Sequence, residues 1–410
     1  MSQLIRDAST LRDANLSMAF EAIWTADGMT RAELSRRLGM SRSTSSSLVQ
    51  ELIDYGLVRE DGPAASTSGR RAITLRPNNQ TWFVLGVDIG ASHVSTLLMS
   101  LSGEVVSTRR ERVDARNKPE LALDAVCSQA KDMMTASRLT AGQILGMGVA
   151  IPAPVEHGTN SRICEETMAA WVGLDVEESL GKRLGIRCII DNDANLGALA
   201  EHWWGVGRQV RNMIYLKLAT GVGCGVIIDG QLHRGQTGFC GEVGHMLLGD
   251  PNGDGRRSFN DLVGRKQLAA RYEELSSVEE GSARIVIKSN QTLAQKAQEG
   301  EENAKTVIAE AGNWVGVAVA NVIHLLNPEL IVLGGSLAAC GDLLLKPVQE
   351  TVARLGGWNK LRETRVTLGR LGERDVATGA ATIVVQAVQS DITGWMSRII
   401  EASEIERAKA

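Results

Sequence analysis

The residues with the clearest potential for chemistry lie between positions 212 and 245, in the sequence NMIYLKLATGVGCGVIIDGQLHRGQTGFCGEVGH. Two apolar runs, 213–218 and 224–228, flank a glycine loop at Thr220–Gly223, and a tight turn follows at Asp229-Gly230. This order predicts a strand, a loop, a strand, a turn and a further strand. Glycines let backbone N–H groups approach a bound oxyanion or sugar closely, but a single glycine loop is more often an ordinary β-turn.

Acidic residues accompany this loop on both sides. Asp191-Asn192-Asp193 directly follows the apolar run Cys188–Ile190, and Glu242-Val243-Gly244-His245 closes the stretch. A carboxylate between the end of a strand and the start of a helix is where α/β folds place ligand chemistry. Such a residue, facing a sugar hydroxyl, could act as the general base of a phosphoryl transfer. The simpler alternatives are that these residues cap the helix predicted at 195–204, and that Glu242 and His245 form a surface turn.

The elements that position these residues occur twice. Residues 82–108 repeat the strand, loop, strand, turn and strand layout about 130 residues earlier, with Asp88-Ile89-Gly90 at the loop. Two copies of one unit, each followed by helical segments, predict a duplicated α/β fold with a cleft between its halves. Further helices are predicted at 120–136, 176–184, 195–204 and 304–326, and further strands at 144–151, 188–190 and 330–333.

The first eighty residues have a different pattern. Leu16, Phe20, Ile23 and Trp24 recur at helical spacing, and Thr30 with Glu33 forms a capping box for a second helix that ends near Leu38. After a turn at Gly39-Met40, Ser41 can cap a third helix that Gly56 ends. This arrangement is typical of a helix-turn-helix, whose last helix enters the major groove of DNA. The residues predicted to contact DNA there are Ser41, Arg42, Ser43, Thr44, Ser45 and Ser46.

A wing is predicted to follow these helices. Leu57–Arg59 and Ala72–Leu75 read as its two strands, and Arg70 and Arg71 stand at its tip, where arginine suits the minor groove or the DNA backbone. Taken separately, the helices fit a protein-interaction bundle equally well, and an arginine pair is usually a solvated turn. The three features in this order, within sixty residues, favour a winged helix that binds DNA.

Composition limits the class of protein. The 410 residues are enough for two or three domains, with 43% hydrophobic and 22% charged residues. No apolar run approaches the roughly 18 residues of a membrane span, and the N-terminus has no signal-peptide core. The six cysteines are scattered, without a Cys-x-x-Cys pair, which favours reduced thiols in the cytoplasm. The net charge is −4, but residues 31–76 carry eight arginines against five acids, which places the basic character in the winged helix.

These patterns predict three domains. Pro77–Gln80 reads as a linker between a winged-helix domain at 1–80 and the α/β region. We expect the first lobe of that region at 81–200, with residues 380–410 as a candidate completion of it, and the second lobe at 201–380.

The chain resembles the ROK family, which is named for repressors, open reading frames and kinases. The resemblance is carried by Asp88-Ile89-Gly90, Ile190–Asn195, Thr220–Gly223, Gly241–His245, and Leu326–Glu329 running into Gly334-Gly335. It implies a hexokinase/actin-like, that is ribonuclease H-like, two-lobed fold. Members with this N-terminal module are sugar-responsive transcription regulators. By position, Asn192, Asp193, Glu242 and His245 resemble sugar ligands, Asp193 resembles the catalytic base of the kinase members, and His245 also resembles a ligand of the family's structural zinc.

Among its departures from the family's pattern, two concern the nucleotide and zinc sites, and a third is the missing asparagine before Trp171, where Glu165–Met168 stands. Ala91-Ser92-His93 replaces the second glycine, threonine and basic residue that follow the first Asp-x-Gly, and a Cβ at Ala91 would crowd a loop that must wrap a triphosphate. The family's cysteine-rich zinc segment is replaced by GDPNGDGRRSFND at 249–261, although a structural zinc needs about four ligands. We therefore expect no zinc or other cofactor, and a vestigial nucleotide site composed of Asp88, Gly90, Thr220, Gly221, Gly223, Gly334 and Gly335.

The leading hypothesis is a cytoplasmic, DNA-binding repressor of carbohydrate genes whose cleft binds a sugar or sugar derivative and so biases two domain arrangements. We expect a homodimer or homotetramer, in which a dimer presents two winged helices to a pseudo-palindromic, double-stranded operator. The alternative is an ATP-dependent sugar kinase with an accessory DNA-binding module, in which Asp193 is catalytic. A third is a constitutive DNA-binding protein with an inactive cleft.

Overall fold

The computed structural model describes residues 8–26, 28–63, 73–156, 162–163, 168–248, 257–277, 290–355, 357 and 363–397. These residues belong to two compact units. Unit 1 takes them from 1–149, 174–190 and 380–410, and unit 2 takes them from 150–173 and 191–379. The chain therefore passes between the units several times, and the observed division differs from the predicted boundary at residue 200.

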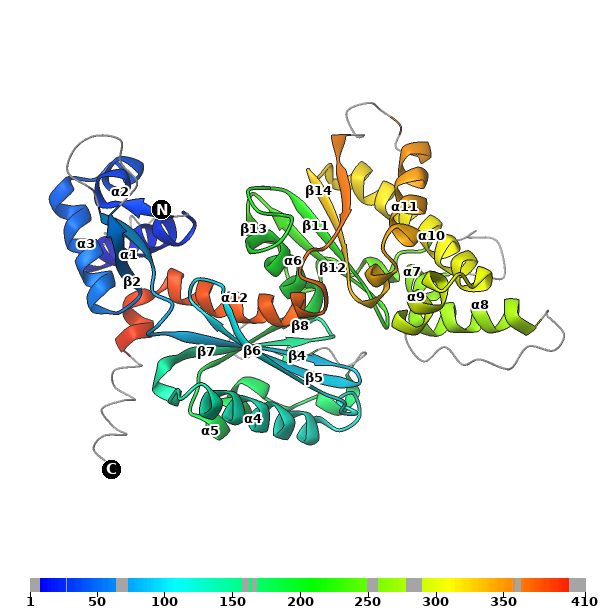
Figure 1. The fold of residues 1–410 in the computed structure, drawn as a ribbon, viewed down its shortest axis with the longest axis horizontal. Coiled ribbons are helices and arrows are strands. Elements are labelled where there is room, and N and C mark those ends of the chain that lie inside the picture. The colour runs from blue at the N-terminus through cyan, green and yellow to red at the C-terminus, as the bar shows by residue number, and fades with distance from the viewer. Residues whose placement is uncertain are drawn as a thin grey trace. The chain divides into compact units, whose positions relative to one another are not determined.

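The N-terminal module of unit 1 has three helices and a small sheet, as the sequence predicts for a winged helix (Figure 1). The strands lie in the order β1-β3-β2, with β2 and β3 antiparallel. The predicted arginines Arg70 and Arg71 belong to the segment between β2 and β3, which lies outside the described residues. The elements are α1 (Ala8–Trp24), β1 (Met29–Thr30), α2 (Arg31–Leu38), α3 (Arg42–Asp54), β2 (Val58–Pro63) and β3 (Ile73–Pro77).

Local hydrogen bonds set the bounds of α2 and α3. The Thr30 N–H donates to the Glu33 carboxylate at 2.8 Å, and the Glu33 N–H donates to the Thr30 hydroxyl at 3.2 Å, which completes the predicted capping box. This bonding lowers the pKa of Glu33. Gly39 ends α2 in the left-handed region, with φ of 63°, where a side chain would be strained. The turn between the two helices therefore follows from the sequence.

Two tryptophans attach this module to the rest of unit 1. The Trp24 indole N–H donates to the carbonyl of Leu101, in the turn after β5. The Trp82 indole N–H donates to the carbonyl of Tyr55, just after α3, at 2.7 Å. The predicted linker is an ordered connection, since the Asn78 N–H donates to the Leu57 carbonyl at 2.9 Å.

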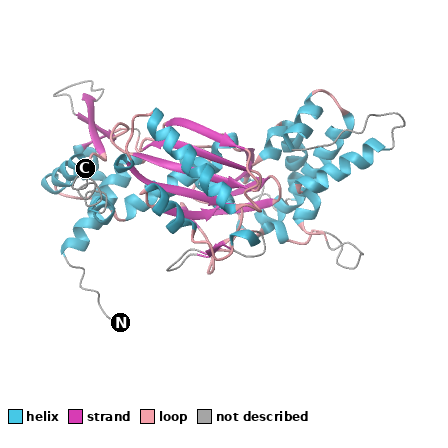
Figure 2. Ribbon diagram, turned by 90° about the horizontal axis from the view of Figure 1, so that it is seen from below, coloured by secondary structure: helices cyan, strands magenta, loops and turns pink. Residues whose placement is uncertain are grey.

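The two larger sheets confirm the predicted duplication. Read from the outer strand of each hairpin, their orders are β6-β5-β4-β7-β10 and β13-β12-β11-β14-β15, so corresponding strands take corresponding places. Helices cover the faces of the strands (Figure 2). The strands are β4 (Phe83–Gly90), β5 (His93–Ser100), β6 (Val105–Glu111), β7 (Ile144–Ile151), β10 (Cys188–Asn192), β11 (Met213–Leu218), β12 (Val222–Ile228), β13 (Gln231–Leu232), β14 (Leu330–Gly334) and β15 (Arg365–Leu368), with β8 (Val155–Glu156) and β9 (Arg162–Ile163) as a separate pair.

Each half of the duplication contributes its last helix to the other unit. Helix α6 follows β10 but packs on β11 and β12 of unit 2, which moves the unit boundary from residue 200 to residue 190. Most of α12 follows β15 but belongs to unit 1, where Figure 1 shows it on the sheet face opposite α4 and α5. The remaining helices are α4 (Pro119–Ala136), α5 (Val176–Leu184), α6 (Asp193–Trp203), α7 (Phe259–Val263), α8 (Arg265–Ser277), α9 (Asn290–Gln298), α10 (Glu302–Leu326), α11 (Asp342–Leu355) and α12 (Asp375–Ser390).

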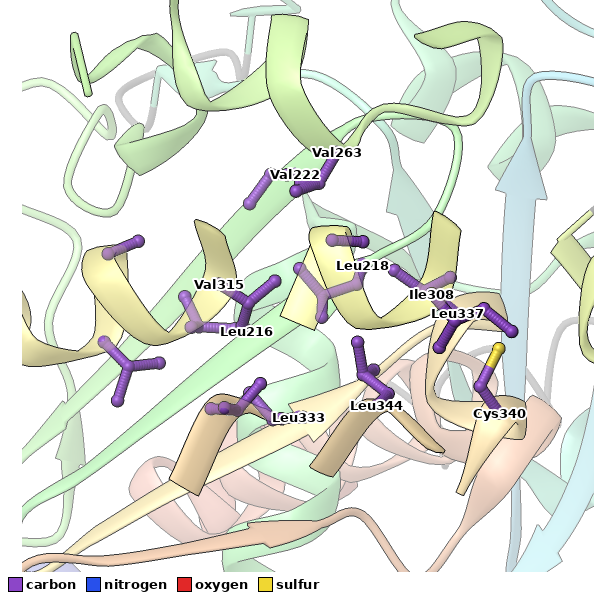
Figure 3. Close-up of a cluster of buried hydrophobic side chains, with 14 of the residues drawn as sticks. Leu216, Leu218, Val222, Val263, Ile308, Val315, Leu333, Leu337, Cys340 and Leu344 are labelled. Atoms are coloured by element: carbon purple, nitrogen blue, oxygen red, sulfur yellow. The ribbon is translucent and has the colours of Figure 1, made fainter. Parts of the chain in front are cut away.

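The side chains of β11 point alternately into two separate hydrophobic cores of unit 2. Ile214, Leu216 and Leu218 enter the larger core, which they share with α10, α11 and β14 (Figure 3). Met213 and Tyr215 point to the opposite face, where Ala198 of α6 packs. Successive side chains of a strand point to opposite faces, so this single strand supports both layers.

Helix α10 is long and apolar enough to cross a membrane, but 61% of its apolar window is buried inside unit 2. Val315, Val319 and Ile323 belong to the larger core. It is therefore the central helix of a globular core.

Within unit 2, Gly379 crosses α6 closely at Leu196, which gives the first prediction. A Cβ at Gly379 would lie 1.7 Å from the Leu196 carbonyl oxygen, whereas a Cβ at Gly181 in α5 would lie 3.6 Å from the nearest atom. We expect Gly379→Ala to lower the free energy of unfolding by about 1–3 kcal/mol. Gly181→Ala is the matched control and should raise it by about 0.5–1 kcal/mol. Urea unfolding followed by circular dichroism measures both, and equal midpoints for the two variants would contradict the crossing.

Candidate DNA-binding surface and ligand site

The start of α3 presents a row of short polar side chains. Arg42, Ser43, Thr44 and Ser46 are exposed, as the predicted DNA contact requires, and Ser47 is exposed beside them. The opposite face, with Leu48, Val49 and Leu52, is buried against α1 and α2. The helix therefore offers hydroxyls and one guanidinium on a surface without bulky side chains.

Two serines of the predicted set have structural roles. The Ser41 hydroxyl caps α3 by accepting from the Thr44 N–H at 3.1 Å, and it remains exposed. The predicted DNA contact of Ser45 is wrong, because this residue is 1% exposed and its side chain cannot reach a base edge. Ser45 precedes Leu48, Val49 and Leu52 by three, four and seven residues, so it lies on their buried face of the helix.

The other arginines of the module divide into paired and exposed groups. Arg31 donates to Glu60 at 3.0 Å and to the Ser46 carbonyl at 3.1 Å, so it holds α3 to the wing. Arg36 and Arg37, in the last turn of α2, are exposed next to the turn that leads into α3. The sequence interpretation did not include these two, although their place before Gly39 was a usable signal.

The candidate ligand site of unit 2 is built around Asp191, whose side chain is fully buried. Its carboxylate accepts from the Arg234 guanidinium at 2.7 and 2.8 Å, from the Asn195 side chain at 3.0 Å and from the Asn192 N–H at 2.7 Å. A buried carboxylate that accepts several hydrogen bonds of this kind is held in one position and fixes its surroundings. Asp191 therefore anchors the junction between β10 and α6.

Asn192 and Asp193 follow in the chain with different roles. The Asn192 side chain accepts from the N–H groups of Ala194 at 2.9 Å and Asn195 at 3.2 Å, and it donates to the Ala153 carbonyl at 3.1 Å. The capping interpretation is confirmed for Asn192, whose oxygen serves the helix. Asp193 begins α6, and its carboxylate forms an ion pair with the Lys217 ammonium of β11.

Glu242 and His245 come from the loop after β13 and lie next to one another. The His245 Nε2 is 3.8 Å from the Glu242 carboxylate, and their side chains are 75% and 36% exposed. Burial raises the pKa of Glu242, His245 opposes this effect, and the charge of Asp193 adds to it. A Cβ at Gly223 of β12 would lie 3.9 Å from the Asp193 carboxylate, and one at Gly241, next to Glu242, would lie 2.0 Å from the Cys224 carbonyl oxygen of the same strand. Unit 2 therefore brings Asp193, Glu242 and His245 to one region of β12.

The glycine loop of unit 2 has much of its backbone already bonded. The Val222 N–H donates to the Asn260 side chain at 2.7 Å, and the Ala219 N–H donates to the Gly221 carbonyl at 2.9 Å. The Thr220 carbonyl accepts from the Arg265 N–H at 3.2 Å. A phosphate cradle needs inward-pointing N–H groups, and Val222 and Ala219 use theirs internally.

Packing explains the other predicted glycines of this unit. A Cβ at Gly223 would lie 2.8 Å from the Ala194 Cβ, and one at Gly334 would lie 2.2 Å from the Tyr215 hydroxyl. Gly335 has φ of 80°, and its Cβ would meet the Leu218 carbonyl at 2.5 Å. These positions require glycine for close approach, whether or not a nucleotide binds.

The corresponding loop of unit 1 is filled by a histidine. The His93 Nε2 lies 2.9 Å from the Asp88 carboxylate, and a Cβ at Gly90 would meet the His93 ring at 2.2 Å. Asp88 and Gly90 therefore form a small contact with His93. The sequence showed the departure from the family here, and the structure shows what occupies the loop.

Three further residues shape the site of unit 2. Lys217, Arg234 and Asn260 bond to Asp193, Asp191 and the glycine loop, and the sequence interpretation did not include them. For Lys217 a signal existed, because one lysine interrupts the apolar run at 213–218.

Whether the chain can hold the family's structural zinc depends on the ligands that the segment after His245 supplies. Within the described residues, no group of three or more histidine, cysteine, aspartate or glutamate side chains could hold a metal ion. Asp261 accepts from the Ser258 hydroxyl at 2.7 Å and completes a capping box at α7. Residues 249–256 lie outside the described residues, so the expected loss of zinc stays a prediction.

Comparison with known proteins identifies the family. The sequence pattern of the ROK family matches residues 84–387, and that of the IclR helix-turn-helix domain matches residues 19–62. The chain is a member of the ROK family, and it carries an N-terminal helix-turn-helix domain.

Relatives of two kinds resemble the chain. A putative xylose repressor of Caldicellulosiruptor sp. strain Rt8B.4 is 26% identical, over 92% of this chain and 96% of the relative. A glucokinase of Halalkalibacterium halodurans is 27% identical, over 66% of this chain and 84% of the relative. Among solved structures, a ROK family transcriptional regulator described as a homologue of the Escherichia coli MLC protein has a TM-score of 0.79 at 22% identity, covering 95% of this chain and 99% of its own. That likeness shows that nearly the whole chain shares the fold of this known structure.

The buried Asp191 gives the second prediction. In Asp191→Asn the Arg234 guanidinium loses its counter-charge, and we expect the free energy of unfolding to fall by about 2–3 kcal/mol. This is less than the ~3–5 kcal/mol of a fully buried pair, because Arg234 is 30% exposed. Asp229→Asn removes the exposed partner of Arg211 and should cost about 0–1 kcal/mol. Urea unfolding of both variants would refute the anchoring role if their losses were equal.

Proposed function

We propose that this protein is a DNA-binding transcription repressor whose ROK region binds a sugar as its effector. The observation that carries the proposal is one chain holding both a ROK match at 84–387 and, before it, a helix-turn-helix whose α3 exposes Arg42 and neighbouring hydroxyls. The putative xylose repressor of Caldicellulosiruptor aligns with 92% of the chain, whereas the glucokinase aligns with 66% of it.

The geometry of α3 supports the DNA-binding part. Ser43, Thr44 and Ser46 are short enough for the helix to approach a major groove, and Arg42 can contact a guanine edge or a phosphate. Arg36 and Arg37 add charge for the DNA backbone. We include Arg70 and Arg71 of the wing in the proposed surface on their sequence position.

Three features favour a sugar receptor over a kinase. Two carboxylates that can accept from sugar hydroxyls, Asp193 and Glu242, lie against the same strand, β12. The polar groups of the two predicted nucleotide loops, in contrast, are bonded within the protein. His93 contacts the Asp88 carboxylate in unit 1, and the Val222 N–H donates to the Asn260 side chain in unit 2. In addition, Lys217 forms an ion pair with the Asp193 carboxylate, which a kinase would need as its general base.

The proposal includes an assembly and a place in the cell. A homodimer or homotetramer would present paired winged helices to a pseudo-palindromic, double-stranded operator. We place the protein in the cytoplasm, where the DNA is. Sugar binding would lower operator affinity by favouring the arrangement that binds DNA less well.

Arg42 provides the test of DNA binding. Fragments that the full-length chain selects from its own chromosome supply the operator. Arg42→Ala should weaken operator binding by about 1–3 kcal/mol, and its salt dependence should flatten by about one counterion if the contact is to a phosphate. Arg12→Ala removes a charge of the same module that is paired with Glu51, and it should retain affinity. Full affinity in Arg42→Ala, measured by fluorescence anisotropy across a salt series, would remove α3 from the interface.

Metal analysis provides the test of the cofactor. We propose that the chain holds no structural zinc, because the segment 249–261 contains no cysteine and His245 cannot complete a site without other ligands. Protein purified without chelators should contain well below one zinc per chain by mass spectrometry. One tightly held equivalent, lost together with folding on chelation, would contradict this.

A further inference from the structure

Lys217 is a charged residue in the otherwise apolar and mostly buried strand β11. Lys217 lies two residues after Tyr215 and points to the same face of the sheet, towards α6. Its partners in register are Gly223 on β12 and Gly334 on β14. A Cβ at Gly223 would lie 3.9 Å from the Lys217 Cβ, so this glycine leaves room beside the lysine stem, whereas the space at Gly334 is occupied by the Tyr215 ring.

This lysine reaches the acid at the start of α6. The Lys217 ammonium is paired with the Asp193 carboxylate, and the two side chains are 15% and 11% exposed. A buried ion pair is weakly screened by solvent, so breaking it leaves an uncompensated charge. An adjacent ammonium also favours the ionised carboxylate and opposes the proton uptake that a general base must perform. Asp193 is therefore suited to accept a hydrogen bond from a hydroxyl while the hydroxyl keeps its proton.

The other two carboxylates of the site in unit 2 also have a basic side chain beside them. Arg234 is paired with the fully buried Asp191 at 2.7 Å, and His245 lies 3.8 Å from Glu242. Among the described residues of this site, each of the three basic side chains thus lies against a carboxylate. A phosphate or carboxylate on the ligand would add negative charge beside Glu242 and Asp193, and like charges placed together weaken binding.

We infer that the effector is a neutral, unphosphorylated sugar, and that Lys217, by holding Asp193 in an ion pair, makes this a site that receives a sugar without deprotonating it. The inference deepens the proposed function and rests on it. Lys217 acts through Asp193 and is in this sense a positioning residue.

Matched ligands test the first part. Thermal shift and titration calorimetry would compare glucose with glucose 6-phosphate and glucuronate, xylose with xylose 5-phosphate, and N-acetylglucosamine with its 6-phosphate. A neutral member should stabilise the protein and bind at least about tenfold more tightly than its charged counterparts. Equal or tighter binding of a phosphorylated or acidic member, or no response to any neutral sugar, overturns this part.

The protein without ligand tests the second part. In Lys217→Met the buried Asp193 carboxylate loses the ammonium that is paired with it, so we expect it to take up a proton at a higher pH than an exposed aspartate. The folded state then binds a proton that the unfolded chain, with an aspartate pKa of ~3.9, does not. The melting temperature of Lys217→Met, relative to the wild type, should therefore rise by about 2 °C or more as the pH falls from 8 to 5. Lys217→Arg keeps the charge and should follow the wild type.

A double variant distinguishes the titration of Asp193 from that of the other titratable groups near it. Glu242 and Tyr215 both interact with the charge of Asp193, and His245 interacts with Glu242. If Asp193 is the source, Asp193→Asn combined with Lys217→Met should have no added pH dependence. A pH profile of Lys217→Met that matches the wild type, or one that persists in the double variant, overturns the role of Lys217.

The outcomes distinguish this inference from the proposed function. Preferential binding of a neutral sugar with no selection of any chromosomal fragment would refute the repressor and leave the ligand class standing. Operator binding that responds to a sugar phosphate would refute the ligand class and leave the repressor standing.

Discussion

The packing of α6 on β11 and β12 is the constraint on which the site depends. The helix approaches so closely that a Cβ at Gly225 would lie 2.5 Å from the Ala194 carbonyl oxygen, and one at Gly197 would lie 2.5 Å from the Tyr215 ring. Because Gly225 of β12 and Gly197 of α6 have no side chain, the start of α6 can lie directly on the strands. Asn192 caps that turn and Asp191 anchors it, so Asp193 has a defined position opposite Lys217.

The same packing changes how the glycine motifs should be interpreted. Gly223, Gly334 and Gly335 resemble parts of a nucleotide site, but each is also required where backbone or side chains meet. Their presence therefore indicates the fold, and it carries little information about nucleotide binding. More informative is what contacts the loops, such as His93 on Asp88 and Asn260 on the Val222 N–H.

Much of the architecture could be predicted from local patterns. Strands β7 and β11 and helix α5 have the predicted bounds, because an apolar run or a helical period between turn residues is a local property. The helix-turn-helix was equally accessible, since Thr30, Glu33, Gly39 and Ser41 act within a few residues of one another. Ser45 was assigned to the wrong face because the serine run conceals the helical period until Leu48 and Val49 are placed in a core.

The sequence by itself determined the class of the fold, the order of its elements, the duplicated halves and the acids at the start of α6. Tertiary structure decided which unit each exchanged helix joins, and which partner each acid has. Lys217 and Asp193 are 24 residues apart, and Arg234 and Asp191 are 43 apart. Helix caps and apolar periods act between near neighbours in the chain, whereas these ion pairs exist only after β11 and α6 have packed, and so their partners could not be read from spacing.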